Sequence, residues 1–206
     1  MPHNKERINT NRLFNLIKSI SSFVDREIFF YALGGTALTL LNIKNSTLDV
    51  DINIESEKDY LYVCELFDQI GFKKSGPIRW ISQEGIAFDI FHGSYILGTD
   101  LLHDCLNKSK FIESFGKIKL YALNPLDIII SKLARGDDRD FEDIKSIFKS
   151  EKIDLKELVD RYKKTMETSI VSNSKQKLLD LIEIKFSEWE YDLDAKLIGE
   201  VKKWDN

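Results

Sequence analysis

Apolar positions recur with two different periods along the chain, and the change of period divides it. Up to about residue 122, short apolar runs that suit strands alternate with stretches of helical spacing. After Asn124-Pro125, which suit the N-cap and the first residue of a helix, helical spacing continues to the end. We therefore expect an α/β half, residues 1–122, followed by a helical region, residues 123–206, packed on it.

The same pattern predicts the individual elements. An amphipathic helix is expected near residues 7–24, and Ile28–Leu33 has the composition of a buried strand. Gly34-Gly35 ends this strand, and Thr36–Leu41 follows as a short helix. Further strands are expected at Leu48–Ile54, Ile78–Ser82, Ile86–Phe91, Lys110–Phe115 and Lys117–Ala122, and further helices at residues 57–70, 125–134, 138–149, 154–168 and 174–203. This order of elements predicts an α/β fold, of the α+β kind, with helices flanking the strands and a C-terminal helical region.

The turn between the first strand and the short helix is suited to bind phosphate. Two glycines, Gly34 and Gly35, let backbone N–H groups approach an anion without a Cβ in the way. The N-terminus of the helix that follows adds unpaired donors and a favourable dipole. A pair of glycines also makes an ordinary tight turn, so this feature alone does not decide between the two interpretations.

Three aspartates on predicted strands are candidate metal ligands. Leu48–Ile54 alternates strictly, so Asp49, Asp51 and Asn53 share one face of that strand. Neighbouring carboxylates repel and favour a cation between them, and oxygen ligands suit Mg²⁺ or Mn²⁺. Asp89 is a single acid inside an apolar strand, where an unpartnered carboxylate is costly. The alternative is that these acids simply point to solvent from half-exposed strands.

The order of these features resembles that of a known superfamily. Gly34-Gly35-Thr36, a short helix, Thr47-x-Asp49-x-Asp51 and a later strand carboxylate resemble the nucleotidyltransferases related to polymerase beta. Two further segments, Leu123–Leu133 and Arg139-Asp140-Phe141-Glu142-Asp143-Ile144, are similar to those of the minimal nucleotidyltransferase and AbiEii-type toxin group. The resemblance spans roughly residues 28–148 and implies a mixed-sheet nucleotidyltransferase core.

The resemblance implies a role for each matching residue. Gly34, Gly35 and Thr36 would hold nucleotide phosphates, with Lys132 reaching the triphosphate, while Asp49, Asp51 and Asp89 would bind Mg²⁺ or Mn²⁺. Asp89 would also accept the acceptor's proton. Thr47, Arg139, Asp140 and Asp143 would support the site, the last three by orienting Lys132 or shaping the site. Arg139 and Asp143 also suit surface salt bridges on helices.

The implied activity is that of a metal-dependent enzyme. It would transfer a nucleoside monophosphate from an NTP to an acceptor hydroxyl on tRNA, protein or a small molecule. The AbiEii likeness adds the expectation of a toxin–antitoxin or phage-defence role with a cognate antitoxin as partner.

One departure from the resembling pattern leaves alternatives open. Many relatives have Arg or Lys two positions before the Thr of Thr-x-Asp-x-Asp, where this chain has Asn45. A catalytically inactive nucleotide-binding or protein-interaction module is therefore a second hypothesis. A third is a helical interaction protein whose α/β half is only a scaffold.

Composition constrains the partners only weakly. The net charge of −4 argues against a wholly basic nucleic-acid surface, although lysines cluster between residues 108 and 119 and Arg79 follows Lys73 and Lys74. Cys64 is expected to be a buried thiol. No apolar signal core or membrane-length run is present, so a cytoplasmic protein without a membrane partner is expected.

The histidines and tryptophans carry weaker expectations. His92 suits either the wall of the site or a loop, and His103 is expected in a helix. Trp80, Trp189 and Trp204 are expected to be packing residues, with Trp80 the one that lies just before the Asp89 strand.

Overall fold

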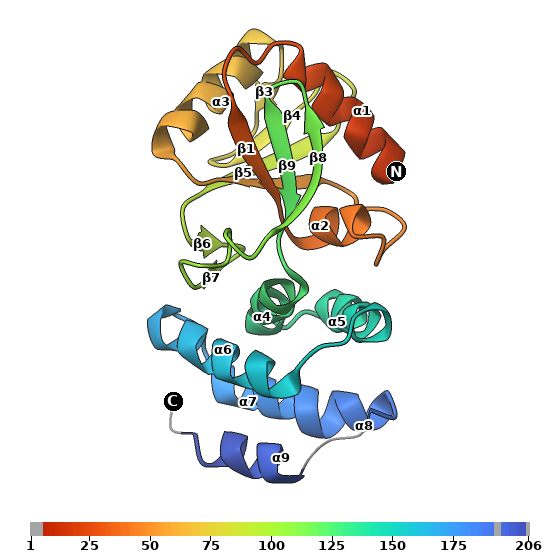
Figure 1. The fold of residues 1–206 in the computed structure, drawn as a ribbon, viewed down its shortest axis with the longest axis vertical. Coiled ribbons are helices and arrows are strands. Elements are labelled where there is room, and N and C mark those ends of the chain that lie inside the picture. Colours follow the sequence, from red (N-terminus) through yellow and green to blue (C-terminus); the bar gives the residue numbers. More distant parts are fainter. Residues whose placement is uncertain (1–5, 192–194, 205–206) are drawn as a thin grey trace. The chain divides into compact units, whose positions relative to one another are not determined.

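The computed structural model describes residues 6–191 and 195–204 and divides into two compact units (Figure 1). The first, here called the sheet unit, contains the chain up to Ile96 together with His103–Asn124. The second, the helical unit, contains Leu97–Leu102 together with the chain from Pro125 onward. Each unit is described separately below.

The sheet unit is built on a seven-stranded mixed sheet with the strand order β3-β4-β5-β2-β1-β9-β8. Two neighbouring pairs, β1 with β9 and β2 with β5, are parallel, and the other described pairs are antiparallel. The strands are β1 (Ile28–Ala32), β2 (Val50–Ile54), β3 (Lys73–Lys74), β4 (Arg79–Ile81), β5 (Ala87–His92), β8 (Lys110–Phe115) and β9 (Ile118–Ala122). The predicted α+β class with a mixed sheet and flanking helices is confirmed.

Helices α1 (Thr10–Ser21) and α3 (Glu57–Gln69) pack on the same face of this sheet. Phe14 of α1 contacts Phe115 of β8, and Phe67 of α3 contacts Phe88 of β5. The strand registers place both sheet residues on one side, which we call the covered face. The opposite side, the open face, carries the alternate residues of each strand, because side chains alternate along a strand.

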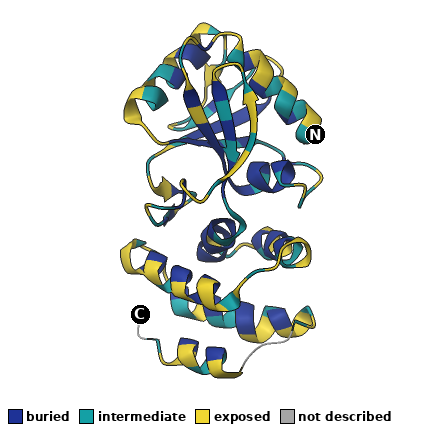
Figure 2. Cartoon of the chain, viewed as in Figure 1, coloured by how far each residue is buried: buried dark blue, intermediate teal, exposed yellow. Residues whose placement is uncertain are grey.

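The covered face contains the main apolar core of the sheet unit. Phe67 lies against Phe72, Trp80 and Phe88, with two of its three ring contacts edge-to-face. Trp80 is buried in this cluster, which agrees with its predicted packing role. Figure 2 shows the central strands β1, β2, β5 and β9 as largely buried and the outer faces of the helices as exposed. Phe88, the fourth aromatic residue of this cluster, fixes the position of β5, the strand that also carries Asp89.

The described helices of the helical unit are all short. They are α4 (Pro125–Arg135), α5 (Asp138–Ser150), α6 (Leu155–Thr168), α7 (Ser174–Leu179), the π-helix η1 (Asp180–Lys185), α8 (Phe186–Glu188) and α9 (Ala195–Lys202). The two-residue strand β7 (Thr99–Asp100) also belongs here, and Ser169 accepts a hydrogen bond from the Asp100 N–H. No helix of the described chain has both the length and the apolar character needed to cross a bilayer.

Several predicted boundaries and residues need correction. The helix expected at 174–203 ends at Glu188, because Glu190 has a left-handed φ of 56° and the Tyr191 N–H bonds back to the Phe186 carbonyl. The reversal lets Phe186, Trp189 and Tyr191 pack together on Phe148 of α5. An amphipathic pattern continues through such a turn, so spacing alone did not reveal it.

Four smaller differences concern local structure. His103 lies in a turn over residues 103–108 and not in a helix. Cys64 is half-buried, whereas Cys105 is the buried thiol. The short strands β3, β6 (Tyr95–Ile96) and β7 were not predicted, because two residues are too few to establish a period. Helix α2 (Gly34–Leu40) begins at Gly34, two residues earlier than expected.

A buried ion pair connects two helices of the helical unit. Arg161 of α6 donates from Nε to Asp127 Oδ1 at 2.7 Å and from a second guanidinium nitrogen to Oδ2 at 2.9 Å. Both side chains are almost completely shielded from solvent. Removing one partner of such a pair leaves the other charge in a low-dielectric interior, which costs more than the pair itself contributes.

We predict that Arg161→Met lowers the free energy of unfolding of the helical unit by about 3–5 kcal/mol. Urea denaturation followed by far-ultraviolet circular dichroism measures this change. The double variant Asp127→Leu/Arg161→Met removes both charges and should recover most of the loss. A single variant as stable as the wild type would show that this pair does not stabilise the helical unit.

Candidate functional site

The three predicted metal ligands converge at one edge of the open face. Asp49 directly precedes β2, Asp51 lies within it, and Asp89 lies opposite Asp51 on β5. One carboxylate oxygen from each residue lies within 4.8 Å of the others. Asp49 and Asp51 are half-buried, and Asp89 is only 7% exposed. Parallel pairing of β2 and β5 in this register is what brings the three charges together.

Thr36 fixes the backbone that carries the two carboxylates of β2. Its hydroxyl donates to the Asp49 carbonyl at 3.1 Å and accepts from the Asp51 N–H at 2.9 Å. The side chain is buried, so it is committed to the protein backbone. Only the backbone amide of Thr36 can therefore make the predicted phosphate contact. Its side chain instead positions the Asp-x-Asp strand.

Both glycines of the turn are required by local geometry. Gly34 has a φ of 47°, in the left-handed region that favours glycine. A Cβ on Gly35 would lie 2.8 Å from Thr47 Oγ1, closer than van der Waals contact allows. Thr47 is held there by two backbone hydrogen bonds with Ile8. The Gly-Gly pair thus allows α2 to approach the segment before Asp49, and Thr47 supports the site through packing.

Arg79 is the main residue of this site that the sequence did not single out. On β4, opposite Asp89, it donates from Nε to Asp89 Oδ1 at 2.7 Å and from Nη2 to Oδ2 at 2.5 Å. The same Nη2 lies 3.8 Å from Asp49 Oδ2. Hydrogen bonding to Asp89 and the charges of all three aspartates raise the pKa of Arg79 against a smaller opposing effect of burial. The guanidinium remains a cation within the carboxylate cluster.

Arg79 follows Lys73 and Lys74 closely in the sequence, but strand pairing separates it from these two lysines. Lys73 and Lys74 are exposed on the short edge strand β3. Arg79 faces Asp89 because β4 and β5 are antiparallel neighbours. In the sequence, Arg79 stands out only as one arginine in a short apolar strand directly before the Asp89 strand. Its partner, Asp89, follows only from the register between these two strands.

Asn53 lies two residues beyond Asp51 on the open face. It is fully buried, and neither its amide oxygen nor its nitrogen has a hydrogen-bond partner among the described residues. Its neighbours in the sheet register are Tyr31 on β1 and Phe91 on β5. An amide buried in this way costs free energy, so the face next to the carboxylates is not optimised for stability alone.

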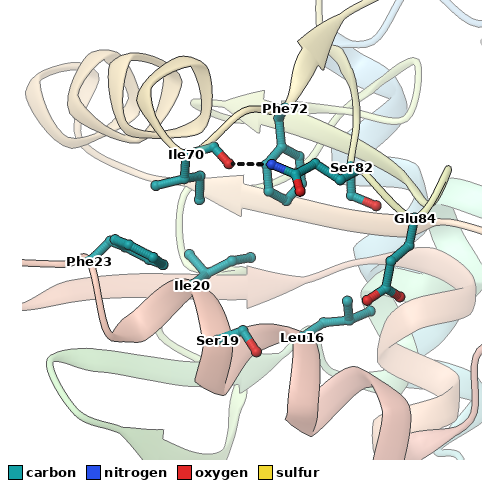
Figure 3. A pocket seen from close by; sticks show the side chains of 9 residues that line it. Leu16, Ser19, Ile20, Phe23, Ile70, Phe72, Ser82 and Glu84 are labelled. Carbon is teal, nitrogen blue, oxygen red and sulfur yellow. Dashed lines mark hydrogen bonds between the residues drawn. The ribbon is translucent and has the colours of Figure 1, made fainter.

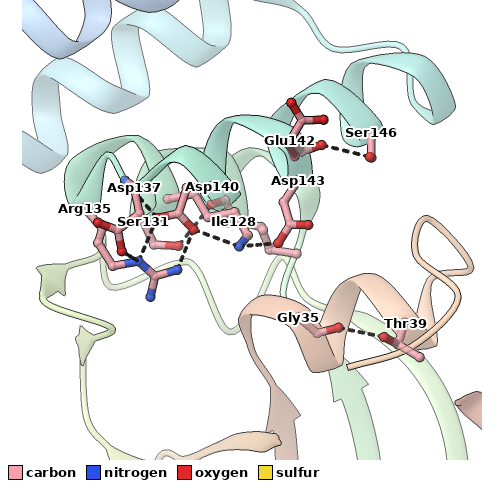
Figure 4. A network of polar contacts seen from close by, with 11 residues as sticks. Gly35, Thr39, Ile128, Ser131, Arg135, Asp137, Asp140, Glu142, Asp143 and Ser146 are labelled. Carbon is pink, nitrogen blue, oxygen red and sulfur yellow. Dashed lines mark hydrogen bonds and ion pairs between the residues drawn. The ribbon is translucent and has the colours of Figure 1, made fainter. Parts of the chain in front are cut away.

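Lys132, predicted to reach the triphosphate, is the centre of a buried network in the helical unit. It is 3% exposed, and its Nζ donates to Asp140 Oδ1 at 3.2 Å and to Asp143 Oδ2 at 2.7 Å. Arg135 adds a bidentate pair to Asp140, with distances of 2.7 and 2.5 Å. Figure 4 shows Arg135, Asp140 and Asp143 around this point. Asp140 and Asp143 therefore both bind the lysine that they were expected to orient.

Arg139 does not join this network. It is exposed, and the described residues include no ion pair from it. Asp143 is buried against Lys132, so the alternative of a surface salt bridge between Arg139 and Asp143 does not occur. Arginine at 139 and aspartate at 143 are spaced for an i,i+4 pair, but the burial of one partner and the exposure of the other prevent it.

His92 lies on the covered face, away from the carboxylates' side of the sheet. Its ring nitrogen Nδ1 is 3.2 Å from the Ile54 carbonyl, and the ring stacks on Tyr60 of α3 at 5.4 Å between centroids. Asp89 and His92 are three residues apart on one strand, so their side chains leave opposite faces. His92 is consequently not part of the carboxylate site.

A separate hollow of about 320 Å³ lies between α1 and the end of α3 (Figure 3). Leu16, Ile20 and Phe23 of the α1 region line one side, and Ile70 and Phe72 line the other. The carboxylate cluster contributes no side chain to it. This hollow is mainly apolar and belongs to the covered face.

The carboxylate cluster on a mixed sheet, supported by a Gly-Gly turn, defines a nucleotidyltransferase-like fold. Residues 11–193 match a family described as nucleotidyltransferase of unknown function (DUF6036). This match covers most of the chain, so the chain belongs to that nucleotidyltransferase family. No curated protein matches the chain.

Two solved structures are similar to this one. An antigenic nucleotidyltransferase-like protein from Paracoccidioides brasiliensis matches with a TM-score of 0.52 and 14% identity, covering 95% of this chain and all of that one. A presumed nucleotidyltransferase from Thermotoga maritima matches with a TM-score of 0.45 and 18% identity, covering 72% of this chain and all of that one. At these identities, the first likeness supports the fold.

We predict that Arg79 and a divalent cation compete for Asp89. Arg79→Gln should lower the melting temperature in EDTA, because Asp89 then loses its guanidinium partner. Adding Mg²⁺ or Mn²⁺ should raise the melting temperature more in Arg79→Gln than in the wild type, because in this variant the metal ion does not have to displace the Arg79 guanidinium. Differential scanning fluorimetry measures both shifts. Lys74→Gln, an exposed neighbour, is the control, and equal metal-induced shifts in all three proteins would contradict competition.

A second prediction concerns Asp140 and follows from its pKa. Burial acts to raise the pKa of Asp140, but bonds and charges from Arg135 and Lys132 outweigh it, and the net pKa is lowered. Asp140 therefore stabilises the folded state above its unfolded pKa of about 3.9 and loses this effect as the pH falls through its lower folded value.

Asp140→Asn should accordingly cost about 1–3 kcal/mol of unfolding free energy at pH 7, with the difference from wild type shrinking below about pH 4. Urea titrations at a series of pH values measure it. The exposed Arg139→Ala should stay within about 0.5 kcal/mol of the wild type throughout. A pH-independent cost for Asp140→Asn would rule out ionisation as its origin.

Proposed function

We propose that this chain is a metal-dependent nucleotidyltransferase that moves a nucleoside monophosphate from an NTP to an acceptor hydroxyl. The observation that carries the proposal is the convergence of Asp49, Asp51 and Asp89 within 4.8 Å on the open face of the sheet. Three carboxylates this close need a cation among them, and their hard oxygen donors fit Mg²⁺ or Mn²⁺. Membership of the nucleotidyltransferase family agrees with this chemistry.

The reaction is an in-line displacement at phosphorus. The acceptor oxygen forms a bond to the α-phosphorus of the NTP, the bond to the bridging oxygen of the β-phosphate breaks, and pyrophosphate leaves. The acceptor proton passes to a carboxylate or to water. Bound metal ions, held by Asp49, Asp51 and Asp89, would supply charge stabilisation at the attacking and leaving oxygens.

The chain's own residues contribute positioning. Thr36 holds the backbone of Asp49 and Asp51, so these carboxylates need little rearrangement when the reaction begins. The first turn of α2 has amide groups without helical acceptors, and Gly34 and Gly35 leave space for phosphate oxygens to reach them. Asp89, opposite Asp51, is the candidate proton acceptor once its oxygens are released by Arg79.

A binding module without catalysis is the second candidate function. The bidentate pair between Arg79 and Asp89 motivates it, because a guanidinium that stayed in place would substitute for one metal charge. Asn45, in place of the basic residue that many relatives carry, adds to it. This hypothesis expects nucleotide binding without a transferred product.

The finer assignment to the AbiEii-type toxins remains a hypothesis that rests on residues 123–133 and 139–144. It implies a nucleic-acid or protein acceptor and a cognate antitoxin. The acceptor found in the transfer experiment below tests it, since label on tRNA is the outcome that this assignment favours, and label on a small molecule is the outcome that argues against it.

We predict that Asp49→Asn and Asp51→Asn each reduce nucleotide transfer by at least about a hundredfold while the fold is retained, because each removes a metal ligand. The assay incubates each α-labelled NTP with the protein, Mg²⁺ or Mn²⁺, total RNA and cell lysate. Asp68→Asn, an exposed aspartate of α3, is the matched control and should keep wild-type transfer. Circular dichroism checks the fold of every variant.

The outcomes separate the two candidate functions. Label in a macromolecule or small molecule with wild type and Asp68→Asn, but not with the two site variants, supports the transferase and excludes the module without catalysis. Transfer retained by Asp49→Asn would remove the assignment of this site. Nucleotide-dependent stabilisation without any labelled product would favour the binding module.

A further inference from the structure

Aromatic side chains gather on the open face of the sheet beside the carboxylates. Tyr121 of β9 lies 5.3 Å from Tyr31 of β1, 5.4 Å from Phe111 of β8 and 6.2 Å from Phe29 of β1, measured between ring centroids. We call these four residues the aromatic platform. The proposed transfer reaction uses none of them.

The sheet register joins the aromatic platform to the site. Phe111, Tyr121, Tyr31, Asn53 and Phe91 form one row across five strands. Asp51 and Asp89 occupy the next row of the same face, two residues along their strands. With ~4.8 Å between strands and ~6.7 Å per two residues, Tyr121 and Asp51 are roughly 12 Å apart along the sheet. An extended chain of a few units is long enough to span this distance, and the intervening Tyr31 and Asn53 are themselves buried.

The platform is accessible in spite of its apolar character. Phe29 is 39% exposed and Phe111 is 51% exposed, whereas Tyr31 is buried and Tyr121 is half-buried. Burial raises the pKa of Tyr31 to about 12, so this ring stays neutral at physiological pH. The two exposed phenylalanines, Phe29 and Phe111, lie on either side of the half-buried Tyr121. An apolar surface that stays exposed in this way often marks a binding site.

The chemistry of the platform favours stacked bases over an added strand. Strand β8 is the sheet edge, but it has a bulge between Phe111 and Glu113 and begins with Lys110, features that oppose pairing with another strand. Lys119 lies on the same face as Tyr121, and its Nζ is 3.3 Å from Ser114 Oγ and 3.9 Å from Glu27. A cation beside several aromatic rings is the arrangement that binds single-stranded nucleic acid.

We propose that the aromatic platform binds the single-stranded end of an RNA acceptor, stacking its bases on Phe29, Phe111 and Tyr121 so that its terminal hydroxyl reaches Asp49, Asp51 and Asp89. This inference rests on the proposed transferase function and names the acceptor class of the same site. Stacking is tolerant of sequence because every base has a π-face, so the platform selects single strands over duplexes and not one sequence over another.

The test is fluorescence anisotropy with a labelled single-stranded polyadenylate of about 12 nucleotides, without NTP or metal. Phe29→Ala and Phe111→Ala should each raise the Kd about tenfold, and the double variant by more, because stacking is lost. Tyr121→Phe keeps the ring and should bind like the wild type. Phe23→Ala, an equally exposed phenylalanine on the covered face, is the matched control and should change nothing. Circular dichroism confirms that the exposed-site variants fold.

Binding and transfer are scored separately, so the two proposals can fail independently. RNA binding that depends on the platform but comes without transfer leaves the platform standing and removes the transferase. Transfer to a different acceptor overturns the platform alone if there is no RNA binding, or if Phe29→Ala, Phe111→Ala and their double variant all retain it. Equal affinity for a duplex also overturns it. Self-association that Phe111→Ala abolishes, with RNA affinity unchanged, would make this face a protein interface instead.

Discussion

Mutual repulsion of three carboxylates is the constraint on which the sheet unit depends. Asp49, Asp51 and Asp89 are brought within 4.8 Å by the parallel pairing of β2 with β5, and this arrangement is unfavourable unless cations balance it. Arg79 provides one such charge from β4, and the backbone of the Asp-x-Asp strand is fixed by Thr36. The fold therefore balances part of this negative charge with its own guanidinium and fixes the backbone that carries the rest.

The two faces of the sheet carry different kinds of side chains. The covered face contains the aromatic core around Phe67, with α1 and α3 packed on it, and this packing fixes the strand register. The open face carries the carboxylates, the aromatic platform and the amide of Asn53, which has no hydrogen-bond partner in the described part of the chain. Because side chains alternate along each strand, stability on one side and chemistry on the other are specified by adjacent residues.

In the helical unit, buried charged side chains are stabilised by pairing with one another. Asp127 with Arg161, and Lys132 with Asp140 and Asp143, place five charged groups in the interior with close partners. Networks of this kind define which helices lie side by side, because each partner is costly without the other. The similarity of residues 123–144 to a known group thus coincides with a structural network in this unit.

The sequence by itself determined the order and kind of most elements and the identity of the three converging aspartates. Strict alternation over Leu48–Ile54 and helical spacing after Pro125 are local properties, and they require only a few neighbouring residues to be recognised. Tertiary structure decided the partner of Asp89, the face on which His92 lies and the separation of Arg139 from Asp143.

The partner of Asp89, the face of His92 and the separation of Arg139 from Asp143 all depend on strand register and burial. Both are set by contacts between segments that are distant in sequence. The end of the helical pattern at Glu188 belongs with them, because a left-handed residue and an aromatic cluster on α5 end the helix without interrupting its amphipathic spacing. A one-residue change of strand register would place Arg79 or Asp89 on the opposite face, so only the packed sheet selects the pairs that make the site.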